Sequence, residues 1–246
     1  MIAVIDYDTG NLCSVANALG RLGAEYRITA SPDEIRGADR VLLPGVGEAS
    51  SAMQKLRERS LVEVIRSLTQ PVLGICIGVQ LLCQSSEEGD TACIGIFDNR
   101  VRKFDTLFAE AGILLPDATG TAAPLSDADS CSARQADVPA DATILRPAGR
   151  LKIPHMGWNS LNVKKPDDPL FRGIPAEARF YFVHSYYVKP DPSLVLATTD
   201  YGMEFCSAYG GNGLWAVQFH PEKSGRFGLA ILRNFYDYCK GARDAR

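Results

Sequence analysis

The chain has 246 residues, of which 46% are hydrophobic and 22% charged, and its formal net charge is −3. This is enough apolar material for a sizeable core, and we predict a single α/β domain over residues 1–246. The slightly negative charge argues against a nucleic-acid partner, and no apolar run is long enough to cross a membrane. The apolar start turns acidic at Asp6 and does not resemble a signal peptide, so we expect a soluble, cytoplasmic protein without a membrane partner.

The seven cysteines form no C-x-x-C pair and have no regular spacing. Neither a disulfide framework nor a metal site is therefore indicated. We expect reduced thiols and no bound metal.

The first third of the chain alternates short apolar runs with helical periodicity. Strands are predicted at residues 2–5, 26–29, 41–43 and 71–75, and helices at residues 12–22 and 61–68. This alternation predicts a mostly parallel, doubly wound sheet with helices on both faces, whose ligands bind at the carboxyl ends of the strands.

The second half is rich in β-forming residues. Strands are predicted at residues 180–183, 194–198, 205–209 and 214–219, with residues 210–213 as a hairpin turn and residues 227–238 as a closing helix. We therefore expect this half to be antiparallel.

Residues 105–149 fit neither half, because they are rich in Ala, Asp, Ser, Thr and Pro. We predict a surface insertion without a chemical role, with a lid or partner-contacting role as the alternative. Replacing it with a short Gly/Ser linker is expected to leave the fold stable.

Cys76 lies between an apolar strand and a helix and is flanked by Gly74 and Gly78. This layout is typical of a nucleophile elbow, in which the tight turn leaves no room for side chains near the nucleophile. The N-terminus of the following helix favours a thiolate and an oxyanion. The alternative is that Cys76 is a small buried apolar residue.

A cysteine nucleophile needs a base, and His220 with Glu222 supplies a base and its orienting acceptor. Pro221 favours an extended His220, and in an extended chain residues two apart point the same way. The alternative is a strand-end histidine beside a solvated glutamate. His184 could compete as the base, but Tyr186 stands where its acidic partner would be.

An oxyanion hole requires N–H donors near the nucleophile. The candidates are Ile77, which follows Cys76, and Val46 and Gly47 in the glycine-rich loop after the third strand. A dinucleotide-binding loop is discarded here, because Ser50 stands where the third glycine would be.

The segments 74–80 (Gly-Ile-Cys-Ile-Gly-Val-Gln) and 219–222 (Phe-His-Pro-Glu) resemble the catalytic signatures of class I (triad) glutamine amidotransferases. Residues 44–47, 154–159 (Pro-His-Met-Gly-Trp-Asn) and 181–186 narrow the resemblance to the HisH family, the glutaminase subunits of imidazole glycerol phosphate synthase. It covers nearly the whole chain except residues 105–149, which that family normally crosses with a far shorter connection.

The resemblance implies the flavodoxin-like α/β fold of these amidotransferases and hydrolysis of glutamine to glutamate and ammonia by a Cys76–His220–Glu222 triad, without a cofactor. Ammonia would pass through a channel to a cyclase subunit that makes imidazole glycerol phosphate and an aminoimidazole carboxamide ribonucleotide in histidine biosynthesis. It also implies two sets of binding residues. Those for glutamine are Gly47, Gln80, Glu88, Ser185 and Tyr186, and those at the cyclase-facing mouth are Asn11, Tyr181 and Lys223.

Three alternatives stay open. A paralogous amidotransferase that feeds another synthase would share the same active-site motifs. A non-catalytic scaffold is disfavoured by the joint presence of Cys76, His220 and Glu222. A cysteine hydrolase or peptidase on a similar fold gives no reason for the Pro-His-Met-Gly-Trp-Asn segment.

Overall fold

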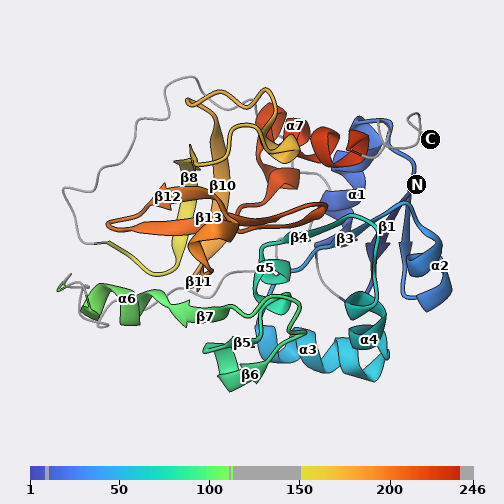
Figure 1. Cartoon of the computed structure of the whole chain (residues 1–246), viewed down its shortest axis with the longest axis horizontal. Coiled ribbons are helices and arrows are strands. Elements are labelled where there is room, and N and C mark those ends of the chain that lie inside the picture. The colour runs from blue at the N-terminus through green and yellow to red at the C-terminus, as the bar shows by residue number, and fades with distance from the viewer. Residues whose placement is uncertain (9–10, 111, 113–150, 239–246) are drawn as a thin grey trace.

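The computed structural model describes residues 1–8, 11–110, 112 and 151–238. Its centre is a run of five parallel strands in the order β2-β1-β3-β4-β14. Figure 1 labels three of them, β1, β3 and β4. The five strands are β1 (Ile2–Ile5), β2 (Tyr26–Thr29), β3 (Arg40–Leu43), β4 (Val72–Ile75) and β14 (Leu214–Val217). All but the edge strand β2 are almost entirely buried, as expected for a parallel sheet covered on both sides.

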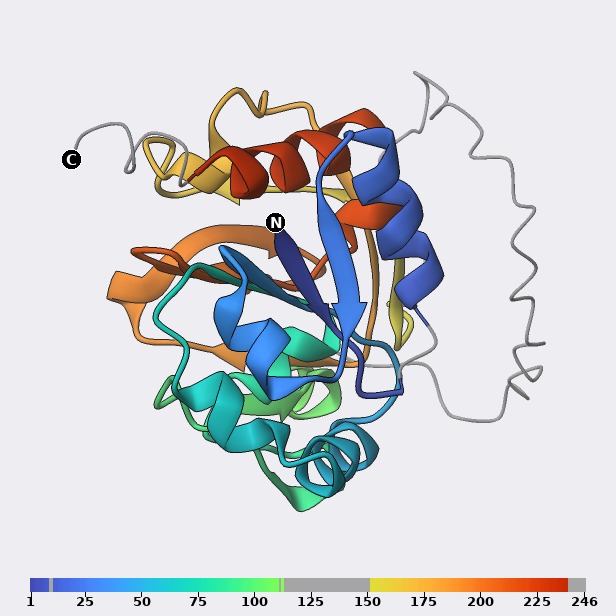
Figure 2. The ribbon, with the colours of Figure 1, turned by 90° about the vertical axis from the view of Figure 1, so that its right-hand side faces the viewer.

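Side chains alternate between the two faces of this sheet. Ile2 and Val4 join one apolar cluster, whereas Ala3 and Ile5 join another. The first face is covered by α1 (Leu12–Arg21) and α7 (Gly225–Asp237), and the second by α2 (Pro32–Gly37), α3 (Ala49–Glu58), α4 (Leu61–Arg66) and α5 (Ile77–Leu81) (Figures 1 and 2).

The sheet continues from β14 into an antiparallel half. It contains β13 (Glu204–Gly211), β11 (Tyr186–Lys189), β12 (Val195–Asp200) and β7 (Arg100–Lys103), with the short strands β5 (Ser85–Ser86), β6 (Thr91–Ala92) and β9 (Asn162–Val163) at its margins. The expectation that the whole second half is antiparallel needs one correction. β14 pairs antiparallel with β13 on one side but parallel with β4 on the other, so it joins the two halves.

Two further strands form a separate antiparallel ribbon, β8 (His155–Ser160) and β10 (Arg179–His184). The chain leaves β10 at His184 and enters the main sheet as β11 at Tyr186. Ser185 is therefore the corner between the two sheets. Four short 3-10 turns complete the described elements: η1 (Glu88–Asp90), η2 (Pro169–Phe171), η3 (Pro192–Leu194) and η4 (Pro221–Lys223).

The predicted insertion is partly helical. Its first six residues belong to α6 (Phe104–Glu110), and Phe108 is fully buried in the core. The expectation of a surface excursion is therefore wrong for Phe108, because its ring stacks on that of Phe104 inside the first apolar cluster. Most of the remainder, residues 113–150, lies outside the described part of the chain.

Within the described ranges, no helix combines the length and apolar character needed to span a membrane.

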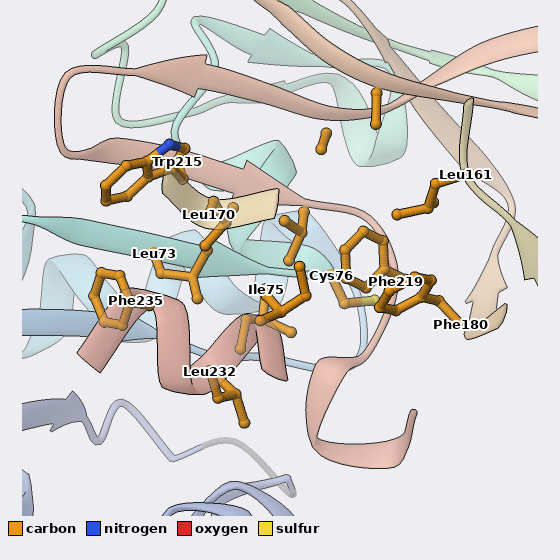
Figure 3. Packing of buried hydrophobic residues seen from close by; sticks show 14 of the residues in the cluster. Leu73, Ile75, Cys76, Leu161, Leu170, Phe180, Trp215, Phe219, Leu232 and Phe235 are labelled. Atoms are coloured by element: carbon orange, nitrogen blue, oxygen red, sulfur yellow. The ribbon is translucent and has the colours of Figure 1, made fainter. Parts of the chain in front are cut away.

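The core reaches the end of β4, where Cys76 lies beside Phe180 and Phe219 in the same apolar cluster (Figure 3). The candidate nucleophile thus lies at the carboxyl edge of the sheet, where ligands of such folds bind.

Candidate active site

Cys76 lies on a strained turn between β4 and α5. Its backbone has φ 51° and ψ −103°, a region that non-glycine residues rarely adopt. A Cβ on Gly78 would collide with the carbonyl oxygen of Leu43, and a Cβ on Gly74 would lie 3.0 Å from the backbone of Gly78. Gly78 therefore lets α5 pack against β3, and Gly74 lets β4 pack against α5, as the glycines flanking Cys76 suggested.

A buried hydrogen-bond network holds His220. Its Nδ1 lies 2.6 Å from Oε1 of Glu222, and the same oxygen accepts a 2.6 Å bond from Nδ2 of Asn11. Because a carboxylate oxygen only accepts, His220 donates from Nδ1 and leaves Nε2 for the nucleophile. This Nε2 is buried, and Cys76 is the neighbour that acts on the imidazole besides Glu222.

The backbone around His220 is also fixed. His220 N–H donates to the carbonyl of Tyr181, and its own carbonyl accepts a bond from the Ser224 hydroxyl. His220 is extended, as Pro221 requires, but Glu222 belongs to the turn η4. The two side chains meet because the chain turns after His220, so the expected reason, a continuous extended segment, is wrong.

The charges at the site support one another. Burial alone disfavours a charged imidazole, but the nearby thiol of Cys76 and the carboxylate of Glu222 outweigh it and hold the pKa of His220 well above its usual range. Burial likewise opposes a charged Glu222, yet His220 and Asn11 keep the pKa of its carboxyl below its ordinary value. The arrangement favours the charged imidazolium form of His220, the state in which it can deliver a proton.

The loop after β3 lies against the residue that follows the nucleophile. A Cβ on Gly45 would collide with the side chains of Ile77 and Tyr7, and the Tyr7 hydroxyl donates to the carbonyl of Pro44 at 2.7 Å. Gly47 has φ 99°, which favours glycine. The predicted oxyanion donors of Val46, Gly47 and Ile77 thus come from two segments in contact through Gly45, and their role stays a prediction.

Three of the residues expected to bind glutamine interact with one another: Gln80 in α5, Glu88 in η1 and Tyr186 in β11. Gln80 is buried and accepts a bond from the Ser86 hydroxyl, while Glu88 accepts one from the N–H of Ala49 at the start of α3. Partial burial raises the pKa of the Glu88 carboxyl. Burial raises the pKa of the Tyr186 hydroxyl, and the negative charge of Glu88 raises it further. Glu88 is therefore close enough to Tyr186 to affect its ionisation.

The corner between β10 and β11 closes the site from the other side. The Cys76 thiol donates a long bond of 3.9 Å to the carbonyl of Val183, and Ser185 and Tyr186 follow directly. His184 does not compete as a base. Its Nε2 faces His155 at 3.0 Å, its Nδ1 faces the carbonyl of Tyr186 at 2.7 Å, and burial lowers its pKa to about 3.

The residues expected at the cyclase-facing mouth differ in exposure. Lys223 is exposed and Tyr181 half-buried, whereas Asn11 is buried against Glu222. Nothing in the sequence suggested this contact, because 211 positions separate the two residues. Met156 and Trp158, on the strand paired with β10, are large apolar side chains with 49% and 37% exposure.

Away from Cys76, the described residues were compared with two other kinds of site, a metal site and a ligand cavity. No group of three or more His, Cys, Asp or Glu side chains among them could hold a metal ion. A cavity of about 380 Å³ is lined by Pro71, Gly213 and Tyr238 among others. It lies at the start of β4, at the opposite edge of the sheet from Cys76.

The fold and the site together define a cysteine hydrolase of the acyl-transfer type, in which a strained thiol faces an imidazole oriented by a carboxylate. The chain matches the family Glutamine amidotransferase class-I over residues 3–239. It therefore belongs to the class-I glutamine amidotransferases.

Curated relatives within this family are subunits named HisH of imidazole glycerol phosphate synthase. The subunit from Nitratidesulfovibrio vulgaris (strain DSM 19637 / Miyazaki F) is 45% identical over 248 residues, covering 100% of both chains. That from Dehalococcoides mccartyi strain 195 is 41% identical and covers 98% of both. These alignments run across the region of residues 105–149, so relatives of the same overall length exist.

Solved structures share the fold at low sequence identity. A putative GMP synthase protein from Thermoplasma acidophilum has a TM-score of 0.64 at 20% identity, covering 99% of this chain and 96% of that one. PurLQS from Thermotoga maritima has a TM-score of 0.59 at 14% identity, covering 96% and 97%.

Proposed function

We propose that this chain is the glutaminase subunit of an imidazole glycerol phosphate synthase and passes ammonia to a cyclase subunit in histidine biosynthesis. The observation that carries the proposal is the buried His220, which Glu222 orients through Nδ1 so that its Nε2 is left for Cys76. The identity of 40–45% to full-length HisH subunits supports the choice of pathway.

The first half of the reaction forms a thioester. The Cys76 thiol gives its proton to His220, and its sulfur attacks the side-chain amide carbon of glutamine, so that the carbonyl oxygen becomes an oxyanion that N–H donors of Gly47 and Ile77 would stabilise. The C–N bond then breaks, and the nitrogen takes a proton from His220 and leaves as ammonia. A raised pKa suits His220 to this step, because the imidazole is protonated before the amide leaves.

The second half hydrolyses the thioester. His220, now neutral, accepts a proton from water, and the resulting hydroxide attacks the thioester carbon. The C–S bond breaks and releases glutamate, and the sulfur takes the proton back from His220, which restores the thiol. Glu222 keeps the imidazole in one tautomer through both halves, since its carboxylate accepts only the Nδ1 proton.

Glutamine would lie between Cys76 and the pair formed by Glu88 and Tyr186. Its α-ammonium group suits the carboxylate of Glu88, which already accepts one backbone bond and retains acceptor capacity. The cyclase would dock beside the site, over the exposed Met156 and Trp158 and the cation of Lys223, because exposed apolar side chains grouped on one strand are typical of an interface.

The test is glutamate release from glutamine by the purified chain, alone and with a histidine-pathway cyclase and its ribonucleotide substrate. We expect strong stimulation by the cyclase. A chain that hydrolyses glutamine, or whose Cys76 reacts with a glutamine-like affinity reagent, but that the cyclase does not stimulate, would instead be an amidotransferase for another synthase. Absence of both reactions would contradict the proposal.

A further inference from the structure

The buried pair His155 and His184 takes no part in the proposed chemistry, yet it adjoins the site. The two residues face each other across the β8–β10 ribbon, with 3.0 Å between Nδ1 of His155 and Nε2 of His184. Three phenylalanine rings surround the pair. The ring centroids of Phe104 and Phe205 lie 5.2 Å from that of His184, and the ring centroid of Phe182 lies 4.9 Å from that of His155.

The hydrogen bonds of this pair run in one direction only. The carbonyl of Tyr186 can only accept, so Nδ1 of His184 donates to it at 2.7 Å. In a neutral imidazole Nε2 then accepts, and the donor is Nδ1 of His155. Nε2 of His155 accepts in turn from Nδ2 of Asn159 at 3.4 Å.

At the Asn159 end, this series of hydrogen bonds is anchored to backbone groups, a carbonyl that can only accept and an N–H that can only donate. Nδ2 of Asn159 donates to the carbonyl of Asp200 at 2.8 Å, and Oδ1 of Asn159 accepts from Ser160 N–H at 2.9 Å. Both ends of the series Asn159, His155, His184 and Tyr186 are thereby defined, and each imidazole has one permitted tautomer.

At its other end, the hydrogen-bond series holds the corner at which the polypeptide passes from the β8–β10 ribbon to the main sheet. His184 is the last residue of β10 and Tyr186 the first of β11, so the bond from Nδ1 closes the bend over Ser185. The carbonyl of Ser185 is held separately by Phe104 N–H at 3.0 Å. Val183, just before the corner, presents its carbonyl to the thiol of Cys76.

We propose that His184 and His155 are positioning residues that hold the corner 183–186 in the shape that binds glutamine against Cys76. This inference rests on the proposed function, because it assigns Ser185 and Tyr186 to the glutamine site. Neither histidine touches the reacting atoms. Their neutral state fits the role, since burial lowers the pKa of His155 to about 4 and that of His184 to about 3.

The test compares His184→Leu with His184→Asn. Leucine removes the bond to the Tyr186 carbonyl, whereas the asparagine amide retains a donor near the position of Nδ1. Each variant is assayed with the cyclase for KM and kcat with glutamine. In parallel, mass spectrometry of the Cys76 peptide follows labelling by a glutamine-like affinity reagent and by iodoacetamide, which needs no glutamine site.

We expect His184→Leu to raise KM at least about tenfold, equivalent to about 1.4 kcal/mol, and to slow affinity labelling similarly. Iodoacetamide should still modify Cys76 at about the wild-type rate, and His184→Asn should recover most of the loss, because its donor is retained. Unchanged KM in His184→Leu, or a loss of affinity labelling that merely equals the fraction of unfolded protein, would overturn the inference.

His155→Phe provides the second variant if His184→Leu does not fold. It fills the aromatic site but removes the donor to Nε2 of His184, so KM should rise by a smaller factor, about threefold, and iodoacetamide labelling should be unchanged. A wild-type KM in a folded His155→Phe would contradict the inference. A wild-type protein that neither releases glutamate nor reacts with the affinity reagent would overturn the proposed function itself.

Discussion

Substitution of Gly78 by alanine tests whether the elbow geometry creates the active site. The added Cβ would lie closer than 3.0 Å to the carbonyl oxygen of Leu43, and a backbone carbonyl in a buried strand cannot rotate away as a side chain can. Overpacking of this kind costs about 1–3 kcal/mol. For a domain of this size that lowers Tm by about 2–4 °C per kcal/mol.

The larger effect should be on activity. Relief of the collision moves α5 away from β3 and displaces Cys76 relative to His220, and a displacement of about 1 Å can cost 10²-fold in rate. Glutamate release with the cyclase present and Tm by calorimetry measure the two effects. Gly20→Ala on α1 is the matched control, since its Cβ would meet nothing within 4 Å, and it should keep full activity. Wild-type activity and Tm in Gly78→Ala would refute the reasoning.

Asn11→Ala should lower kcat about tenfold or more at saturating cyclase, because it removes a buried hydrogen-bond donor from Glu222. Asn17→Ala, in the helix α1 that Asn11 caps, is the control and should change nothing. A weaker affinity for the cyclase with unchanged kcat would instead make Asn11 an interface residue only. Lowering the pH from 7 to 5 should reduce the urea-derived free energy of unfolding. The pKa values of His155 and His184, about 4 and 3, lie below the ordinary 6.5, so the unfolded chain binds more protons below pH 6.5 and stability falls by up to about 1.4 kcal/mol per pH unit for each histidine. The double variant His155→Phe/His184→Asn should show a shallower dependence, and an unchanged slope would contradict it. Phe108→Ala should cost about 3–5 kcal/mol because its ring is fully buried. Contrary to the expectation from the sequence, a linker in place of residues 105–149 should therefore destabilise the fold, and a Tm equal to that of the wild type would show that α6 is dispensable.

The elements that local pattern determines were predictable. Apolar runs and periodicity gave the strands at residues 2–5, 26–29 and 41–43 and the closing helix, all of which the structure contains. The prediction lacked α2 and α3, although Ser31 followed by Pro32 is a recognisable helix start, and its hydroxyl does cap α2.

What the sequence could not give depends on contacts between distant segments. The pairing of β14 with β4 brings His220 to Cys76, and no local pattern of either strand specifies its neighbour. Asn11 reaches Glu222 only because α1 and η4 pack together. The histidine pair was likewise hidden, because His155 and His184 become neighbours through the register of the β8–β10 ribbon.

The central claim is that the thiol of Cys76, served by His220 and Glu222, hydrolyses glutamine. Its most direct test is glutamate release by the complex of this chain with the cyclase, compared between the wild type and Cys76→Ala. We expect turnover in the wild type and none above background in the variant, with the Tm of the two proteins alike because Cys76 is small and its replacement leaves the elbow glycines in place. Substantial glutamate release by a folded Cys76→Ala complex would contradict the account.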